Sequence, residues 1–71
     1  MKNNEISELI KLCRKKAALS QVDLSDQCGV GLRFIRELES GKKTVQMDKV
    51  NQVLNFFGYE LTASKIKQNS L

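Results

Sequence analysis

The chain has 71 residues, with 12 lysines and arginines against 8 aspartates and glutamates, and a net charge of +4 at neutral pH. This length allows one small domain, and the positive charge favours a polyanionic partner such as nucleic acid. There is no histidine, and the two cysteines form no Cys-x-x-Cys pair, which argues against a zinc site. No nucleophile–base pair and no glycine-rich phosphate loop stand out, so we expect neither an enzyme nor a cofactor.

The cellular location is predicted from what the sequence lacks. The N-terminal stretch MKNNEISELI has no apolar core of a signal peptide, and no run approaches the roughly 18 apolar residues of a membrane span. We therefore expect a cytoplasmic protein that does not enter a membrane, with Cys13 and Cys28 as reduced, small apolar side chains. A disulfide between the two cysteines is the alternative that the sequence leaves open.

The first predicted helix covers residues 5–17. Acidic residues at its start and basic residues at its end suit the helix dipole. Its apolar residues recur at helical spacing and form one stripe, which comprises Ile6, Leu9, Ile10, Cys13 and Ala17.

Two short helices with a tight turn between them are predicted next. Ser20 and Asp23 stand three positions apart, like the two members of a capping box, at the start of a helix over residues 21–27. Gly29 suits the left-handed position that ends such a helix. The following helix is expected to run from Gly31 to Glu39.

The last predicted helix covers residues 47–57, and a strand-like segment follows it. Residues 59–64, YELTAS, alternate in a pattern typical of a short strand. Because a lone strand cannot satisfy its own backbone groups, we expect it to pair with its copy in a second chain. Phe56, Tyr59 and Leu61 are the expected dimerisation residues. A polar tail without structure is the alternative, and residues 65–71 are expected to be a flexible tail.

The third predicted helix exposes a polar face. With its apolar residues toward the core, Arg33 and Glu37 fall on the far side, flanked by Arg36. Arg33 can donate to both acceptors of a guanine, and Glu37 can accept from cytosine N4 or restrain Arg33. At the helix start, Leu32 can contact a thymine methyl, and Gly31 would allow the backbone to approach DNA closely. An ordinary solvated helix face is the alternative interpretation.

Groups that can bind phosphate flank this helix on both sides. Gln21 opens the preceding helix, whose N-terminus attracts anions. Lys42, Lys43 and Thr44 follow the polar helix and can contact the DNA backbone. Such groups on either side of a base-reading helix fit the docking of a helix-turn-helix on DNA.

The stretch LSQVDLSDQCGVGLRFIRELESGKK resembles the helix-turn-helix of the Xre family, the lambda-repressor-like or Cro/CI-type domains. The residues in register with that family's pattern are Leu19, Ser20, Gln21, Leu24, Gly29, Val30, Ile35, Leu38, Glu39 and Gly41. The resemblance covers about residues 5–58 and implies an all-α domain of four to five helices. The stretch GKKTVQMDKVNQVLNFFGYEL further resembles the HipB-like branch, small repressors and antitoxins with a dimerising strand after the last helix.

The resemblance also implies roles for individual positions. The family's phosphate contact falls on Gln21 and its structural ion pair on Arg14 and Glu39, which would tie the recognition helix to the first helix. Its base-reading positions fall on Gly31, Leu32, Arg33 and Glu37, and its backbone-contacting loop on Lys42, Lys43 and Thr44. Arg36 stands where the family often has serine, and Gly31 where it usually has a serine or threonine cap.

These observations together predict a homodimeric transcriptional regulator that binds a palindromic operator in double-stranded DNA. Residues 1–64 would form a single helix-turn-helix domain with its C-terminal dimerisation segment. An autoregulating repressor is expected. A narrower expectation is that this repressor is the antitoxin of a HipB-like toxin–antitoxin system. The alternative is a protein-interaction module, an antitoxin whose main role is to bind a toxin protein.

Overall fold

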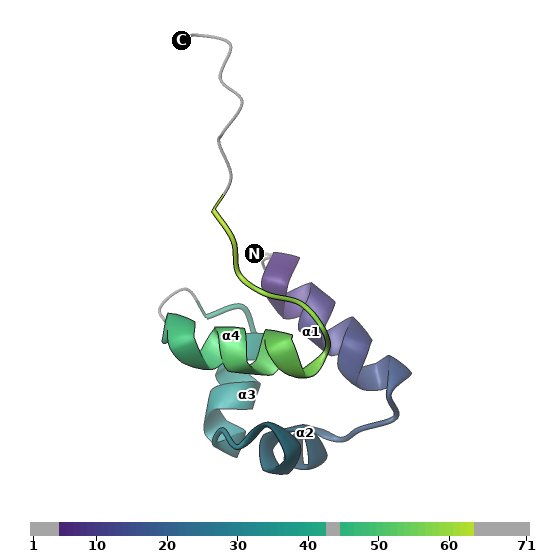
Figure 1. Ribbon diagram of the computed structural model, residues 1–71. Helices are drawn as coiled ribbons and strands as arrows, with labels where there is room; N and C mark the ends of the chain where they lie inside the picture. The colour runs from purple at the N-terminus through teal and green to yellow at the C-terminus, as the bar shows by residue number, and fades with distance from the viewer. Residues whose placement is uncertain (1–4, 43–44, 64–71) are drawn as a thin grey trace, which may run out of the picture.

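The computed structural model describes residues 5–42 and 45–63 of the chain. This part forms four helices, namely α1 (Glu5–Lys16), α2 (Gln21–Cys28), α3 (Leu32–Glu39) and α4 (Met47–Phe56) (Figure 1). The predicted all-α class is confirmed, and the predicted helix ends agree with these bounds to within one residue.

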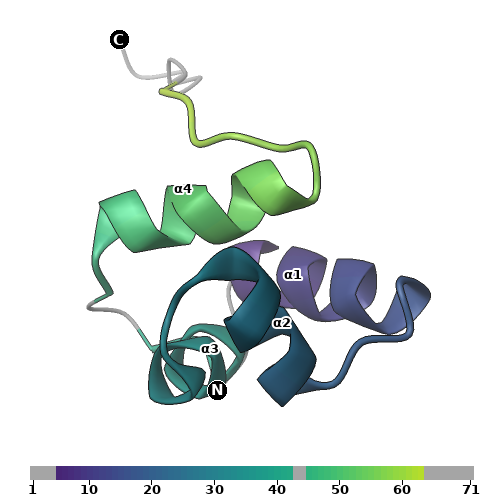
Figure 2. The same cartoon turned by 60° about the horizontal axis from the view of Figure 1, so that its bottom comes forward.

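All four helices contribute to one apolar core. Figure 2 shows α4 lying over the other three helices, with α2 and α3 crossing beneath it. The buried apolar side chains, all at most 7% exposed, are Ile10, Leu24, Val30, Ile35, Leu38, Val50, Val53 and Leu54. Because each fully buried side chain of this size stabilises the fold by about 1.5–3 kcal/mol, this core holds α3 with one face inward and the other free.

A complete capping box begins α2. The hydroxyl of Ser20 accepts a hydrogen bond from the backbone N–H of Asp23, and the Asp23 carboxylate accepts one from the backbone N–H of Ser20, each at 3.0 Å. The hydrogen bonds to Ser20 lower the pKa of the Asp23 carboxyl. The carboxylate is therefore ionised at neutral pH beside the positive end of the α2 dipole, where a negative charge is favourable.

The turn between α2 and α3 is fixed by hydrogen bonds from two sides. Gly29 has the left-handed backbone (φ 78°), and its N–H donates to the carbonyl of Ser25. The hydroxyl of Ser25 donates to the carbonyl of Val30 at 2.6 Å, inside the core. From α4, the amide of Gln52 donates to the carbonyl of Cys28 at 2.6 Å. The chain therefore changes direction within three residues while the carbonyls of Cys28 and Val30 stay paired.

The two cysteines are free thiols, and both are half-buried. Cys28 packs against the core. Burial raises the pKa of the Cys28 thiol, which suits a small apolar side chain rather than a nucleophile.

The strand predicted over residues 59–64 does not form in its described part, residues 59–63. The chain instead folds back on α4: the N–H of Tyr59 donates to the carbonyl of Leu54 at 2.8 Å, and that of Leu61 to Asn51 Oδ1 at 2.9 Å. A strand needs a partner strand for its backbone groups, and no strand is present elsewhere in residues 5–42 and 45–63. Ser64 and the predicted tail at 65–71 lie outside the described residues.

Two further negative findings concern the described residues alone. None of their helices is long and apolar enough to cross a membrane. Within residues 5–42 and 45–63, no three histidine, cysteine, aspartate or glutamate side chains gather into a group that could hold a metal ion.

The two glycines of the turn are expected to respond oppositely to the same substitution. Gly29→Ser places a side chain on a left-handed backbone, with its Cβ 3.4 Å from Gln52 Nε2, and should destabilise the protein by about 1–2 kcal/mol. Gly31 has an ordinary extended backbone with open space around it and no side-chain cap for α3. Gly31→Ser should therefore stabilise the protein by up to about 1 kcal/mol. Urea unfolding followed by circular dichroism tests both variants, and shifts of the same sign would contradict this account of the turn.

Candidate nucleic-acid interface

A buried carboxylate anchors the C-terminal end of α3. The Glu39 side chain, 4% exposed, accepts hydrogen bonds from Arg14 Nε at 2.6 Å, from Arg14 Nη2 at 3.0 Å and from Gln21 Nε2 at 3.1 Å. Arg14 Nη1 also donates to the carbonyl of Leu19 at 2.9 Å. The hydrogen bond to Glu39 raises the pKa of the Arg14 guanidinium. One carboxylate therefore joins the last turn of α1, the first residue of α2 and the end of α3.

The opposite face of α3 is open to solvent. The side chain of Arg33 is 91% exposed, and Arg36 is exposed as well. Leu32 is half-buried at the first position of the helix, and the exposed Gly31 precedes it. All four are residues at which the sequence predicts contact with DNA.

Glu37, another predicted contact on this face, lies close to two basic side chains. Its carboxylate lies 3.5 Å from Arg33 Nε and 3.3 Å from Lys42 Nζ, so one acidic side chain joins two basic ones. The Lys42 side chain is 46% exposed and that of Glu37 32%. Lys43 and Thr44, the other predicted contacts in this loop, lie outside the described residues.

Gln21 is placed differently from the other predicted contacts. It is half-buried, and its side-chain amide donates to Glu39. The capping box engages the N–H groups of Ser20 and Asp23, whereas the N–H of Gln21 belongs to the helix end, where no intrahelical acceptor exists. A phosphate contact by Gln21 would therefore use its backbone N–H or its second amide hydrogen.

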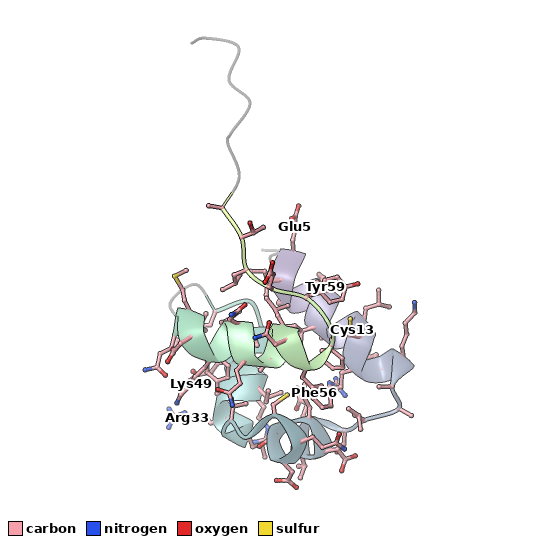
Figure 3. All side chains as sticks on the ribbon, viewed as in Figure 1. Glu5, Cys13, Arg33, Lys49, Phe56 and Tyr59 are labelled. Carbon is pink, nitrogen blue, oxygen red and sulfur yellow. The ribbon has the colours of Figure 1, made fainter. Side chains whose placement is uncertain are left out.

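Lys49 is a basic residue of this region that the sequence reasoning missed. It lies in the first turn of α4 and is exposed, and its Nζ lies 6.0 Å from the centre of the Phe34 ring in α3. Figure 3 shows Lys49 and Arg33 projecting on the same side of the molecule. Helical periodicity alone does not indicate which neighbouring helix an exposed side chain such as Lys49 lies over.

Comparison with known proteins gives the family. The family model described as a helix-turn-helix domain matches residues 7–69, which include α2, α3, α4 and all of α1 except its first two residues. The chain belongs to the helix-turn-helix family. Over 54 residues it is 48% identical to y4mF of Sinorhizobium fredii, named as an uncharacterized HTH-type transcriptional regulator, and the alignment covers 76% of this chain and 71% of that relative. These matches agree with the predicted Xre-like family, whereas the HipB-like branch stays a prediction.

The three predicted dimerisation residues of this helix-turn-helix protein do not share one surface. Phe56 and Tyr59 are 41% and 48% exposed. Figure 3 shows Tyr59 over α1 near Cys13, while Phe56 lies on the α2 side of α4. Leu61 is half-buried and packs against the core of its own chain. Tyr59 and Phe56 therefore remain available to a partner, and Leu61 is largely used by the monomer.

Tyr59 borders a shallow groove between α1 and the segment after α4. The groove has a volume of about 390 Å³ and is lined by Leu9, Leu12, Cys13, Lys16, Ala17, Phe57 and Tyr59. Leu12, which points away from the predicted stripe of the first helix, is 54% exposed on this surface. Two large exposed apolar side chains thus lie on one groove.

Removal of the arginine that neutralises Glu39 should destabilise the protein strongly. Arg14→Ala leaves a buried carboxylate with one neutral amide as its remaining side-chain partner, and breaking such a pair costs about 3–5 kcal/mol. A chain of this length has a stability of roughly 4–11 kcal/mol, so much of the total is at stake. Urea unfolding measures the loss. The control is Lys15→Ala at the neighbouring exposed position, expected to change stability by less than about 0.5 kcal/mol; similar losses in both variants would show that the ion pair has no special role.

Proposed function

We propose that this protein is a sequence-specific DNA-binding transcriptional regulator that inserts α3 into the major groove. The observation that carries the proposal is the division of α3 into two faces. Ile35, Leu38 and Glu39 are buried and fix the helix in the domain, while Arg33 on the other face is 91% exposed. A short helix held rigidly with hydrogen-bonding side chains outward suits the reading of base edges. The relative named as a transcriptional regulator supports the same conclusion.

The proposed contacts fall into two classes. Arg33 donates to the two acceptors of a guanine, Glu37 faces a neighbouring base pair, and Leu32 and Gly31 approach the groove at the start of α3. Contacts of the second class go to phosphate and position the domain without reading the base sequence. The residues proposed to make them are Gln21, Arg36, Lys42, Lys43, Thr44 and Lys49. Lys49 joins this class because its Nζ lies 6.0 Å from the centre of the Phe34 ring of α3, and Figure 3 shows it projecting on the same side as Arg33.

We further propose that the protein acts as a homodimer on a palindromic operator and represses its own gene. A single domain presents one recognition helix, whereas a two-fold dimer reads two half-sites about 34 Å apart and gains specificity from both. Occupation of a promoter by such a dimer is sufficient to block transcription.

A second candidate function is supported by the groove at Leu12 and Tyr59. Its exposed apolar side chains suit a protein partner. The HipB-like resemblance makes a toxin protein the proposed partner, with the chain as its antitoxin. One chain can bind DNA and a toxin together, because Tyr59 and Arg33 lie on different sides of the domain (Figure 3). A toxin in this groove would compete with a second copy of the chain for Tyr59.

DNA recognition should depend on Arg33. Fluorescence anisotropy with duplex DNA from directly upstream of the gene, against a scrambled duplex and over a salt series, should show specific binding about 10³-fold or more tighter. Arg33→Ala should weaken the specific complex by about 1–3 kcal/mol, through loss of the guanine contact. The control is Lys11→Ala on α1, whose side chain pairs with Glu8 and which should bind as the original protein does. Equal weakening by both variants, or tight binding by Arg33→Ala, would contradict the proposed role of α3.

Self-association should depend on Phe56 and Tyr59. The double variant Phe56→Ala, Tyr59→Ala should sediment as a monomer at concentrations at which the original protein sediments at twice the mass of one chain. Val22→Ala serves as the control, because Val22 is also a large apolar residue and is 50% exposed, but it lies on α2. A monomer in all three cases, or a dimer in all three, would show that these two residues do not form the interface.

A further inference from the structure

The carboxylate of Glu37 lies between basic side chains on the face of α3 that is proposed to bind DNA. Glu37 Oε2 lies 3.5 Å from Arg33 Nε, and Glu37 Oε1 lies 3.3 Å from Lys42 Nζ. Each of its two oxygens is therefore engaged by a different basic side chain. Arg33, Glu37 and Lys42 together form a charge cluster.

The charge cluster contributes little to the fold. The Arg33 side chain is 91% exposed and that of Lys42 46%, and ion pairs between side chains this exposed stabilise proteins weakly. Within α3 the basic residue precedes the acidic one, which is the less favourable order for a pair four residues apart. Glu37 differs in this respect from Glu39, which is 4% exposed and holds three helices together. Stability therefore does not account for an acidic residue at position 37.

The position of Glu37 has a direct consequence for binding to DNA of arbitrary sequence. Such binding depends on how many phosphates the basic side chains neutralise. A carboxylate that pairs with Arg33 and Lys42 competes with phosphate for both, and its charge is repelled by the DNA backbone. Glu37 should therefore weaken non-specific binding.

At a suitable base sequence the same carboxylate becomes favourable. Arg33 can exchange Glu37 for the two acceptors of a guanine, and the freed carboxylate can accept from the amino group of a cytosine in the major groove. Lys42 can exchange Glu37 for a phosphate. At a DNA site with no amino group within reach, Glu37 gives up its pairs with Arg33 and Lys42 and gains no hydrogen bond in return. The affinity for that DNA site is therefore lower.

We propose that Glu37 determines the specificity of this protein by holding Arg33 and Lys42 until a cytosine amino group replaces them. The proposal rests on the proposed DNA-binding function and adds to it a residue that lowers affinity for most DNA in order to raise discrimination. It also predicts that each half-site of the operator has a G·C pair at the position that Glu37 contacts.

The test compares Glu37→Gln with the matched control Glu5→Gln. Both variants remove one negative charge with the same change of side chain, and Figure 3 shows Glu5 at the opposite end of the molecule from Arg33. The original protein and both variants first select duplexes from a pool randomised over about 20 base pairs, enough for two half-sites. Anisotropy then gives their affinities for the duplex selected by the original protein and for a scrambled duplex, over a salt series. Circular dichroism checks that each variant is folded.

Glu37→Gln should bind the scrambled duplex roughly five- to tenfold more tightly at 0.1 M salt, with a salt slope steeper by about 0.9, because Lys42 gains a phosphate. Its ratio of selected to scrambled affinity should fall at least tenfold, and it should no longer select the G·C pair at one position of each half-site. Glu5→Gln should match the original protein within about twofold.

Three results would overturn the proposal, and they are distinguishable. If Glu37→Gln selects the same duplexes with unchanged affinities, Glu37 has no role in specificity although the DNA-binding function stands. If Glu5→Gln tightens binding to the scrambled duplex as much as Glu37→Gln does, the effect is one of net charge. If the original protein selects no sequence at all, the proposed function fails and the inference falls with it.

Discussion

The arrangement of this domain depends on one buried carboxylate. Glu39 receives three hydrogen bonds, from two nitrogens of Arg14 and one of Gln21. A buried charge without partners is costly, so any movement of α3 relative to α1 or α2 that breaks these contacts is opposed. Apolar packing alone tolerates small rotations of a helix, whereas hydrogen bonds restrict direction as well as distance. The hydrogen bonds to Glu39 therefore set the orientation of α3, and the apolar core supplies most of the attraction between the helices.

The turn at the other end of α3 completes this restraint. Gly29 adopts a backbone that other residues rarely adopt, and Val30, directly after it, is 7% exposed. Ser25 is small enough to be buried beside the turn while its hydroxyl pairs with the carbonyl of Val30. With the start of α3 held by the turn and its end held by Glu39, the exposed face between them is presented in a fixed position. Rigid support of this kind is what precise recognition requires.

The sequence predicted the helices well and the contacts between them less completely. Apolar spacing and glycine positions are local properties, so the helix ends agree to within one residue. Ala17, assigned to the inner stripe of the first helix, is exposed because α1 ends at Lys16 and the chain turns through Ala18 with φ 58°. The alternation of apolar and polar residues after Gly58 suggested a strand, but the N–H of Leu61 donates to the side chain of Asn51 and not to a partner strand. The contact of Lys49 with Phe34 depends on how α4 lies over α3, which no local pattern contains.

The two carboxylates of α3 show how burial separates the roles of identical side chains. Glu39 has lost its hydration, so its partners cannot be exchanged for water or for a ligand without a large cost. Glu37 keeps about a third of its side chain exposed, and its pairs with Arg33 and Lys42 compete with water at all times. Weak, exposed pairs can be exchanged at a binding surface, whereas buried ones cannot. Two residues apart on α3, one carboxylate thus fixes the helix in the domain and the other forms pairs that can be exchanged at the surface.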